Sequence, residues 1–362
     1  MKRVLVAPGK IVIGAGVLAE AGDYIKSYGA AALLIALEED HERVRETLDG
    51  SAREYGVRII FAPFGGECSY GQIEELEERF ADSGADVVLG LGGGKAIDAA
   101  KIYADRQGLP FISVPTVAST DAPCSAWAIM YDENHIHKGG RLLKSNPQVV
   151  LVDSGIIARA PERFLVAGMG DAYSTYFEAR ACRKTGVLNN GGLSTISAFA
   201  LAELSCKTLL EKGEAALQDC RAGVVTPALE DVIEANIVMS GIGFESVGVA
   251  AAHGLLRTFE VLGADEAMHG EIVAFGTLVQ LVLENAPEDE IQTTVDFFSK
   301  VSLPVRLSDL GIKNVSCDLL KEAAEHAFDK PALIRNMPFV VTQEMICEAI
   351  LRADSLTGDP DL

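Results

Sequence analysis

The sequence predicts an α/β domain with a mostly parallel, Rossmann-like sheet over residues 1–160 and an all-helical domain over residues 161–362. In the first part, short apolar runs alternate with stretches in which apolar residues recur every three to four positions, a pattern typical of strands joined by helices. After Ala160-Pro161 the helical pattern continues with little strand signal. Because two domains enclose a cleft, we expect the ligand site between them.

The individual elements follow from the same periodicities. Short apolar runs predict strands at residues 2–6, 31–36, 57–62, 86–90, 111–114 and 149–152. Amphipathic stretches between them predict helices at residues 17–28, 41–55 and 72–82. Longer stretches in the second half predict helices at residues 164–183, 192–210, 229–244, 248–262, 271–283 and 289–301.

Composition and charge exclude several classes of partner. The net charge of −21 would repel nucleic acid and anionic membranes, so we expect neither as a partner. No apolar run reaches the roughly 18 residues that span a bilayer, and the start is too short for a signal peptide, so we expect a cytoplasmic protein. The seven cysteines are scattered and form no CxxC pair, which argues against a disulfide framework or a cysteine zinc site.

A glycine-rich turn gives the first functional signal. The apolar run 87–91 leads into Gly92-Gly93-Gly94 and then into a helical pattern from Ala96. Glycines at a strand-to-helix turn let the backbone approach a ligand closely, and the N–H groups of the new helix face an anion. We therefore expect this turn to hold the pyrophosphate of a dinucleotide, although its spacing differs from GxGxxG.

The strand predicted at 111–114 ends in a polar segment. Residues 113–125 carry several hydroxyl side chains and the carboxylate of Asp121. Ligands of open α/β sheets bind beyond the carboxyl ends of the strands. Together with the glycine turn, this segment indicates a dinucleotide-using enzyme.

The strand predicted at 31–36 ends in Leu37-Glu38-Glu39-Asp40. A carboxylate here, for which we take Glu38, can accept hydrogen bonds from the adenosine ribose and repel a 2′-phosphate, which favours NAD over NADP. The same acidic residues also suit the positive end of a helix dipole. The sequence leaves both interpretations open.

Three residues of the helical half are candidate metal ligands. Asp171 follows Gly168-Met169-Gly170, His253 lies in a run of small residues, and His269 precedes an apolar helix. One carboxylate and two imidazoles suit a divalent metal with an open position, although spacing alone favours hydrogen-bonded helix histidines. The other histidines, which we expect at the surface, are His41, His135, His137 and His326. Residues 357–362 are expected to fray.

Seven stretches, spread over nearly the whole chain, resemble the glycerol dehydrogenases of the iron-containing (group III) alcohol dehydrogenase superfamily. They lie at residues 62–69, 92–95, 115–126, 164–171, 224–234, 243–246 and 269–271. The run Ser119-Thr120-Asp121-Ala122-Pro123-Cys124-Ser125 resembles the glycerol dehydrogenase branch in particular. The resemblance implies the architecture shared with dehydroquinate synthase, an α/β domain followed by a helical domain. It also implies a homo-oligomer, with an octamer as one option.

The resemblance also implies roles for individual residues. Asp171, His253 and His269 would bind the catalytic metal, zinc in this branch with iron as the alternative, and Asp121 would bind a substrate hydroxyl. NAD would lie along the glycine turn and the segments that follow it. The residues assigned to it are Gly92, Gly93, Gly94, Lys95, Asp98, Thr116, Ser119, Ser125, Trp127, Tyr131 and, at the ribose, Glu38.

The chain departs from the family pattern at three places. Leu256 stands where the family has a second histidine, Gly139-Gly140 lack an aromatic residue, and Leu37 falls at the family's ribose-binding aspartate. We therefore expect a metal-dependent, NAD-linked enzyme that interconverts glycerol or another vicinal diol and its hydroxyketone. The alternatives are a dehydrogenase for another small alcohol, hydroxyketone or glycerol-1-phosphate, a lyase on the same scaffold, and a non-catalytic NAD-binding member.

Overall fold

The structure, a computed structural model, describes residues 1–132 and 137–357. Its α/β half is built on one six-stranded sheet in which every neighbouring pair of strands is parallel. In spatial order the strands are β2 (Ile11–Gly14), β9 (Val149–Asp153), β6 (Phe111–Pro115), β5 (Val87–Gly92), β3 (Ala31–Ala36) and β4 (Arg58–Pro63).

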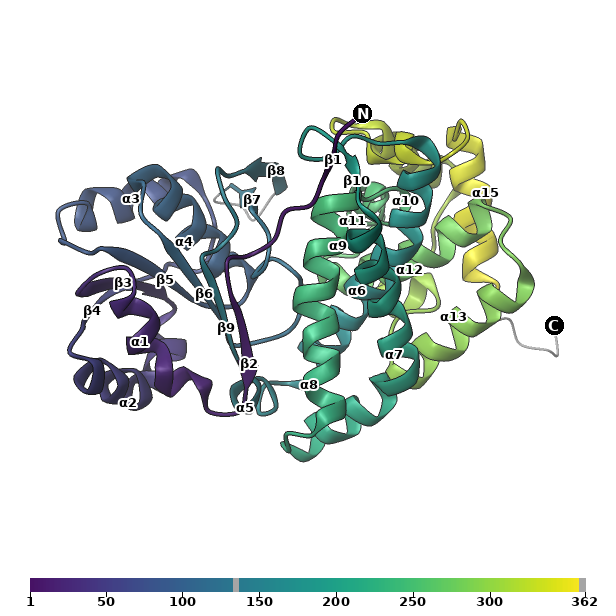
Figure 1. The fold of residues 1–362 in the computed structure, drawn as a ribbon. Coiled ribbons are helices and arrows are strands. Elements are labelled where there is room, and N and C mark those ends of the chain that lie inside the picture. Colours follow the sequence, from purple (N-terminus) through teal and green to yellow (C-terminus); the bar gives the residue numbers. More distant parts are fainter. Residues whose placement is uncertain (133–136, 358–362) are drawn as a thin grey trace.

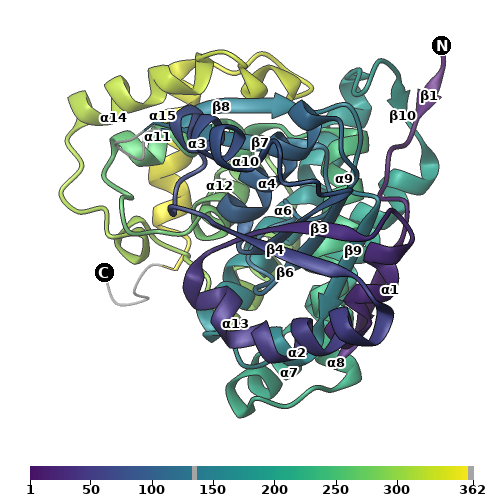
Figure 2. The same cartoon turned by 90° about the vertical axis from the view of Figure 1, so that its left-hand side faces the viewer.

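Helices cover both faces of this sheet (Figure 2). Leu33 and Ile35 pack against α3 and α4, whereas Leu34 packs against α1 and α2, because successive side chains of a strand point to opposite faces. Both faces are thus buried, which explains the continuous apolar strands. The helices of this half are η1 (Val17–Glu20), α1 (Ala21–Lys26), α2 (Glu38–Tyr55), α3 (Tyr70–Phe80), α4 (Gly94–Gln107) and α5 (Ser154–Ile157).

The second half is a bundle of helices beside the sheet (Figure 1). Thr195 and Thr226 cap two of its helices by accepting hydrogen bonds from backbone N–H groups of the first turn. Its elements are α6 (Glu162–Thr185), α7 (Ile196–Ala222), α8 (Pro227–Glu234), the π-helical turn η2 (Ala235–Met239), α9 (Ser240–Val247), α10 (Ala251–Gly254), α11 (Leu256–Val261), α12 (His269–Leu283), α13 (Glu288–Val301), η3 (Leu307–Leu310), α14 (Cys317–Glu325), η4 (His326–Phe328), η5 (Leu333–Asn336) and α15 (Gln343–Asp354).

The predicted fold class is confirmed, but one predicted strand has a different partner. The strand expected at 2–6 is only β1 (Arg3–Val4), and it pairs with β10 (Leu193–Ser194) of the helical half instead of joining the α/β sheet. The prediction of a purely helical second half is therefore wrong at residues 193–194. The first residues cross between the two halves in Figure 1. The domain boundary at 160/161 stays a prediction.

Several elements were not predicted. They are β2, a hairpin of β7 (Trp127–Tyr131) and β8 (His137–Leu142), and the helices α14 and α15. His135 and residues 358–362, for which we expected surface exposure and fraying, lie outside the described residues. Within the described residues no single helix is long and apolar enough to cross a membrane; only Pro227–Val247 and Ala251–Val261 together reach that length and composition, across an 85° bend.

Candidate active site and metal centre

Asp171, His253 and His269 come together in the helical half. One potential ligand atom from each lies within 4.8 Å of the others. Nε2 of His253 is 3.3 Å and Nε2 of His269 is 3.5 Å from Oδ1 of Asp171, longer than charge-assisted hydrogen bonds. Both oxygens of Asp171 are buried, and no donor in the described part of the chain is hydrogen-bonded to them. A buried carboxylate without donors, facing two imidazoles, fits a divalent cation.

Close crossing of two helices brings two of these ligands together. Asp171 lies on α6 and His269 is the first residue of α12. A Cβ atom on Gly270 would lie 1.8 Å from the carbonyl oxygen of Ala167, and one on Gly170 would lie 2.3 Å from the carbonyl oxygen of Gly270. The two glycines therefore let the backbones approach closely enough for Asp171 and His269 to meet.

The third ligand, His253, is oriented by a buried carboxylate. Oε2 of Glu178 lies 2.6 Å from Nδ1 of His253, while Oε1 accepts hydrogen bonds from the backbone N–H groups of Ala250 and His253. Burial lowers the pKa of His253, but the charges of Glu178 and Asp171 outweigh it and raise that pKa well above its ordinary value. A carboxylate on Nδ1 leaves Nε2 directed at the cluster, which is the arrangement of metal-bound histidines.

An ion pair fixes the start of the helix that carries His269. Arg163, near the start of α6, donates to both carboxylate oxygens of Glu271 at 2.7 and 2.8 Å, and to the carbonyl oxygen of Glu266. Glu271 also accepts a hydrogen bond from the backbone N–H of Met268, the residue before α12. Arg163 therefore connects the two helices on which Asp171 and His269 lie.

Asp121 faces the same cluster from the segment that follows β6. Its Oδ2 accepts a hydrogen bond of 2.7 Å from Oγ of Ser240, the first residue of α9 after the π-helical turn. Burial and the neighbouring charge of Asp171 raise the pKa of Asp121 well above its ordinary value. Gly241 permits this approach, because a Cβ atom there would lie 2.7 Å from Cβ of Cys124.

The glycine turn has the predicted geometry. β5 ends at Gly92, whose φ of +140° is rarely adopted by residues with a side chain, and α4 begins at Gly94. A Cβ atom on Gly94 would lie 3.4 Å from Oγ1 of Thr120, so Gly94 borders the segment that follows β6. The backbone N–H of Thr116 donates to the carbonyl oxygen of Gly92, which places the segment after β6 beside the turn. Among the described residues no side chain caps the start of α4, which leaves its first N–H groups available to a pyrophosphate.

The other predicted cofactor residues differ in their contacts and burial. Nζ of Lys95 lies 2.6 Å from Oε2 of Glu67 and 4.8 Å from the ring centre of Tyr131. Ser125 is buried and Trp127 is half-exposed on β7. Ser119 is half-buried in the segment after β6.

Asp98, also assigned to the cofactor, is directed into the protein. Its side chain is buried, forms an ion pair with Lys101 and accepts a hydrogen bond from the backbone N–H of Ile129. Lys101, also buried, donates to the carbonyl oxygens of Ala122, Ser125 and Trp127. Because both carboxylate oxygens contact protein groups, Asp98 holds the segment after β6, and its assignment to the cofactor stays a prediction.

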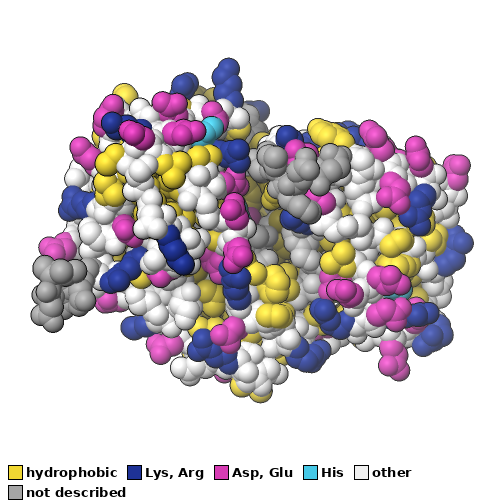
Figure 3. Space-filling model, turned by 180° about the vertical axis from the view of Figure 1, so that it is seen from behind, with side chains coloured by type: hydrophobic (Ala, Val, Ile, Leu, Met, Phe, Trp, Pro, Cys, Tyr) yellow, Lys and Arg dark blue, Asp and Glu magenta, His cyan; other side chains and the backbone are white. Residues whose placement is uncertain are grey.

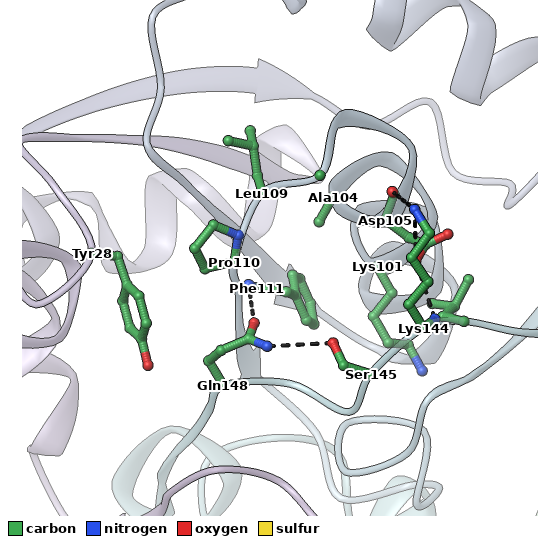
Figure 4. Close-up of a pocket in the computed structure, with 12 residues that line it drawn as sticks. Tyr28, Lys101, Ala104, Asp105, Leu109, Pro110, Phe111, Lys144, Ser145 and Gln148 are labelled. Atoms are coloured by element: carbon green, nitrogen blue, oxygen red, sulfur yellow. Dashed lines mark hydrogen bonds and ion pairs between the residues drawn. The ribbon is translucent and has the colours of Figure 1, made fainter. Parts of the chain in front are cut away.

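Two of the cavities formed by the described residues border the α/β sheet, one of them at its ligand-binding edge. A cavity of about 610 Å³ lies beyond the carboxyl ends of β2 and β9, between α2 and α5. Another of about 340 Å³ is lined by Tyr28, Asp105, Phe111 and Gln148 at the amino end of β6, away from the glycine turn (Figure 4). In the space-filling view a crease separates the two halves of the molecule (Figure 3).

Comparison with known proteins identifies the family of the chain. Residues 8–154 match the family described as iron-containing alcohol dehydrogenase. The chain is 43% identical to a glycerol dehydrogenase of Escherichia coli, over 98% of this chain and 97% of that one. It is 38% identical to a glycolaldehyde reductase of Halobacterium salinarum, over 98% of each. The crystal structure of a probable glycerol dehydrogenase from Sinorhizobium meliloti 1021 has a TM-score of 0.92 at 38% identity and covers 98% of this chain and 99% of that one.

A parallel α/β half with a glycine turn, joined to a helical half with an Asp-His-His cluster, defines a dehydrogenase. The chain belongs to the iron-containing alcohol dehydrogenase family, and within it to the glycerol dehydrogenases.

Sequence reasoning missed residues that support the site. Glu178 could have been found, because it lies two helical turns after Asp171 and therefore on the same face of α6. Ser240 and Arg163 carried no signal, because their partners are distant in the sequence.

Proposed function

We propose that this protein oxidises glycerol, or a related vicinal diol, to the hydroxyketone with NAD, and catalyses the reverse reaction. The main support for the proposal is the cluster of Asp171, His253 and His269. Asp121 lies close enough for the charges of Asp171 and His253 to act on it. The relatives named above act on glycerol or glycolaldehyde, small substrates with adjacent oxygens.

A divalent ion, for which zinc is our first choice and iron the alternative, would be held by these three side chains and would polarise a substrate hydroxyl as a Lewis acid. Asp171 supplies a carboxylate without other donors, and Glu178 keeps Nε2 of His253 available. His269 is the more exposed ligand, with 39% of its side chain accessible, and lies toward the open side of the cluster.

Asp121 would orient the second hydroxyl of the substrate. Ser240 occupies Oδ2 of Asp121, so Oδ1 is the oxygen left for a substrate hydroxyl. A diol would therefore have two anchors, one at the metal and one at Asp121, whereas a simple alcohol would have one.

NAD would supply the hydride acceptor when bound, with its pyrophosphate on residues 92–95. Thr116, Ser119, Ser125, Trp127 and Tyr131 are proposed to line the cofactor between this turn and the metal. Homo-oligomerisation and a cytoplasmic location stay predictions of the sequence.

A phosphorylated substrate is less well supported. Such a substrate needs basic side chains that can bind the phosphate. Near the cluster, Arg163 is paired with Glu271 and Arg257 with Glu260. A neutral polyol requires no such group, which favours glycerol over glycerol-1-phosphate.

The test compares His269→Ala with the surface variant His326→Ala. We expect His269→Ala to lose turnover of glycerol but to bind NADH normally, because the cofactor would be held by the other half of the chain. Binding can be followed by the fluorescence of Trp127, the single tryptophan. Normal turnover in His269→Ala would refute the metal site, and failure of both proteins to bind NADH would refute the cofactor assignment.

A further inference from the structure

We propose that Asp40, held by Arg43, is the carboxylate that binds the adenosine ribose of the dinucleotide, in place of Glu38. This inference rests on the dinucleotide function proposed above. It replaces the residue that the sequence suggested for this role.

Asp40 lies directly beside the glycine turn. It is on the first turn of α2, which begins where β3 ends, and only 8% of it is exposed. Its Oδ2 lies 3.2 Å from the position that a Cβ atom on Gly92 would occupy. Glu38 and Glu39, on the same turn of the helix, are exposed to solvent. Among the three acidic residues, Asp40 is thus the one turned toward the cradle.

The other oxygen of Asp40 is bonded to a residue that lines the large cavity. Oδ1 accepts a hydrogen bond of 3.1 Å from Nη1 of Arg43. Arg43, Val44 and Thr47 line the cavity of about 610 Å³, opposite Ile156 on α5. Val44, Ile156 and their apolar neighbours give this cavity walls that suit a purine ring.

The order of these features matches the order of groups in a dinucleotide. Pyrophosphate on residues 92–95 and adenine in the cavity would place the intervening ribose at Asp40. A carboxylate is an acceptor for the two ribose hydroxyls, whereas Leu37 offers no polar side-chain atom.

The same arrangement determines the response to a 2′-phosphate. Asp40 would repel this phosphate and also engages Arg43. Arg159 and Asp153 line the cavity as well, so removal of the Asp40 charge would leave Arg43 without its acidic partner at a wall that carries two arginines. Asp40 is therefore the residue that sets the preference for NAD over NADP.

The test uses calorimetric binding of ADP and 2′-deoxy-ADP to the full-length protein, with no turnover involved. In the wild type we expect loss of the 2′-hydroxyl to weaken binding about tenfold, as for a charge-assisted hydrogen bond. In Asp40→Asn, ADP should bind about tenfold more weakly and the difference between the two ligands should shrink. Glu38→Gln, the matched control, should behave as the wild type.

A second ligand tests specificity. The ratio of affinities for NADP and NAD should rise about tenfold or more in Asp40→Asn, and it should stay unchanged in Glu38→Gln. The inference is overturned if Glu38→Gln, and not Asp40→Asn, loses the discrimination against 2′-deoxy-ADP. If wild type binds neither ADP nor NAD, the proposed dinucleotide function itself is refuted. Equal thermal unfolding of the two variants verifies that both are folded.

Discussion

Glu178 contacts His253 twice, once at the ring nitrogen Nδ1 at 2.6 Å and once at the backbone N–H at 2.9 Å. The side chain of Glu178 is fully buried, and its Oε1 also accepts the backbone N–H of Ala250. One carboxylate therefore fixes both the ring orientation of His253 and the start of α10 that carries it.

Glu178→Gln should weaken metal binding by about ten- to a hundredfold, because the carboxylate on Nδ1 orients the imidazole of His253 and makes it a stronger metal ligand. ADP binding should stay unchanged. Competition with a coloured zinc chelator measures the affinity. Asp329→Asn is the matched control, because Asp329 bonds to Nδ1 of the surface residue His326. Equal zinc affinities for wild type and Glu178→Gln would contradict this prediction.

Gly270→Ala should destabilise the fold by about 1–3 kcal/mol or more, because the new methyl group would overlap the carbonyl oxygen of Ala167. The same change at Gly50, which lies inside α2 with no atom within 4 Å of the added Cβ, should stabilise the protein by about 0.5–1 kcal/mol. Urea unfolding of both variants provides the comparison. Gly270→Ala should in addition bind zinc more weakly, because α6 and α12 must separate to make room for the methyl group. Unchanged stability of Gly270→Ala would contradict the prediction, because it would show that the two helices can shift at no cost in free energy.

Asp121→Asn should reduce the preference for diols over ethanol by about ten- to a hundredfold, the equivalent of about 1–3 kcal/mol for one anchor. Propane-1,2-diol and butane-2,3-diol should compete with glycerol in the wild type, because Leu256 and Gly139-Gly140 make the predicted pocket wall more apolar and wider than the family pattern. Steady-state kcat/KM values for the four alcohols measure both effects. Full discrimination by Asp121→Asn would eliminate the two-anchor arrangement.

Glu245 should give the stability a distinctive pH dependence. Burial raises the pKa of Glu245. Hydrogen bonds from the backbone N–H of Ala126 and the side-chain amide of Asn146 lower this pKa, but by less than burial raises it. Because the folded-state pKa exceeds the unfolded value of about 4.3, the contribution of this group is complete below the unfolded pKa and is lost as pH rises through the folded pKa.

Glu245→Gln has no carboxyl group at this position and therefore does not lose stability when that group would ionise. Its Tm relative to wild type should therefore increase as pH rises from about 4 toward neutrality. Thermal unfolding at a series of pH values checks the sign, and Glu46→Gln on the exposed side of α2 is the control. A difference between wild type and Glu245→Gln that stays constant or falls over this range would contradict the raised pKa.

The sequence by itself determined the local features, because these depend on residues close together in the chain. Continuous apolar runs such as 31–36 and 87–91 predicted buried parallel strands, and three consecutive glycines predicted the strand-to-helix turn at Gly92. The resemblance added the ligand set Asp171, His253 and His269, which spacing alone could not select.

Tertiary structure decided which distant groups meet. The apolar run at 2–6 looks like any edge strand, and only packing assigned Arg3–Val4 to Leu193–Ser194 of the helical half. Asp98 lies next to the glycine turn in sequence, yet the helix directs it at the buried Lys101, while Asp40 is turned toward Gly92. Side-chain direction depends on the rotation of each helix against the sheet. Burial of the whole apolar face sets that rotation. The residue pattern around one position therefore does not predict it.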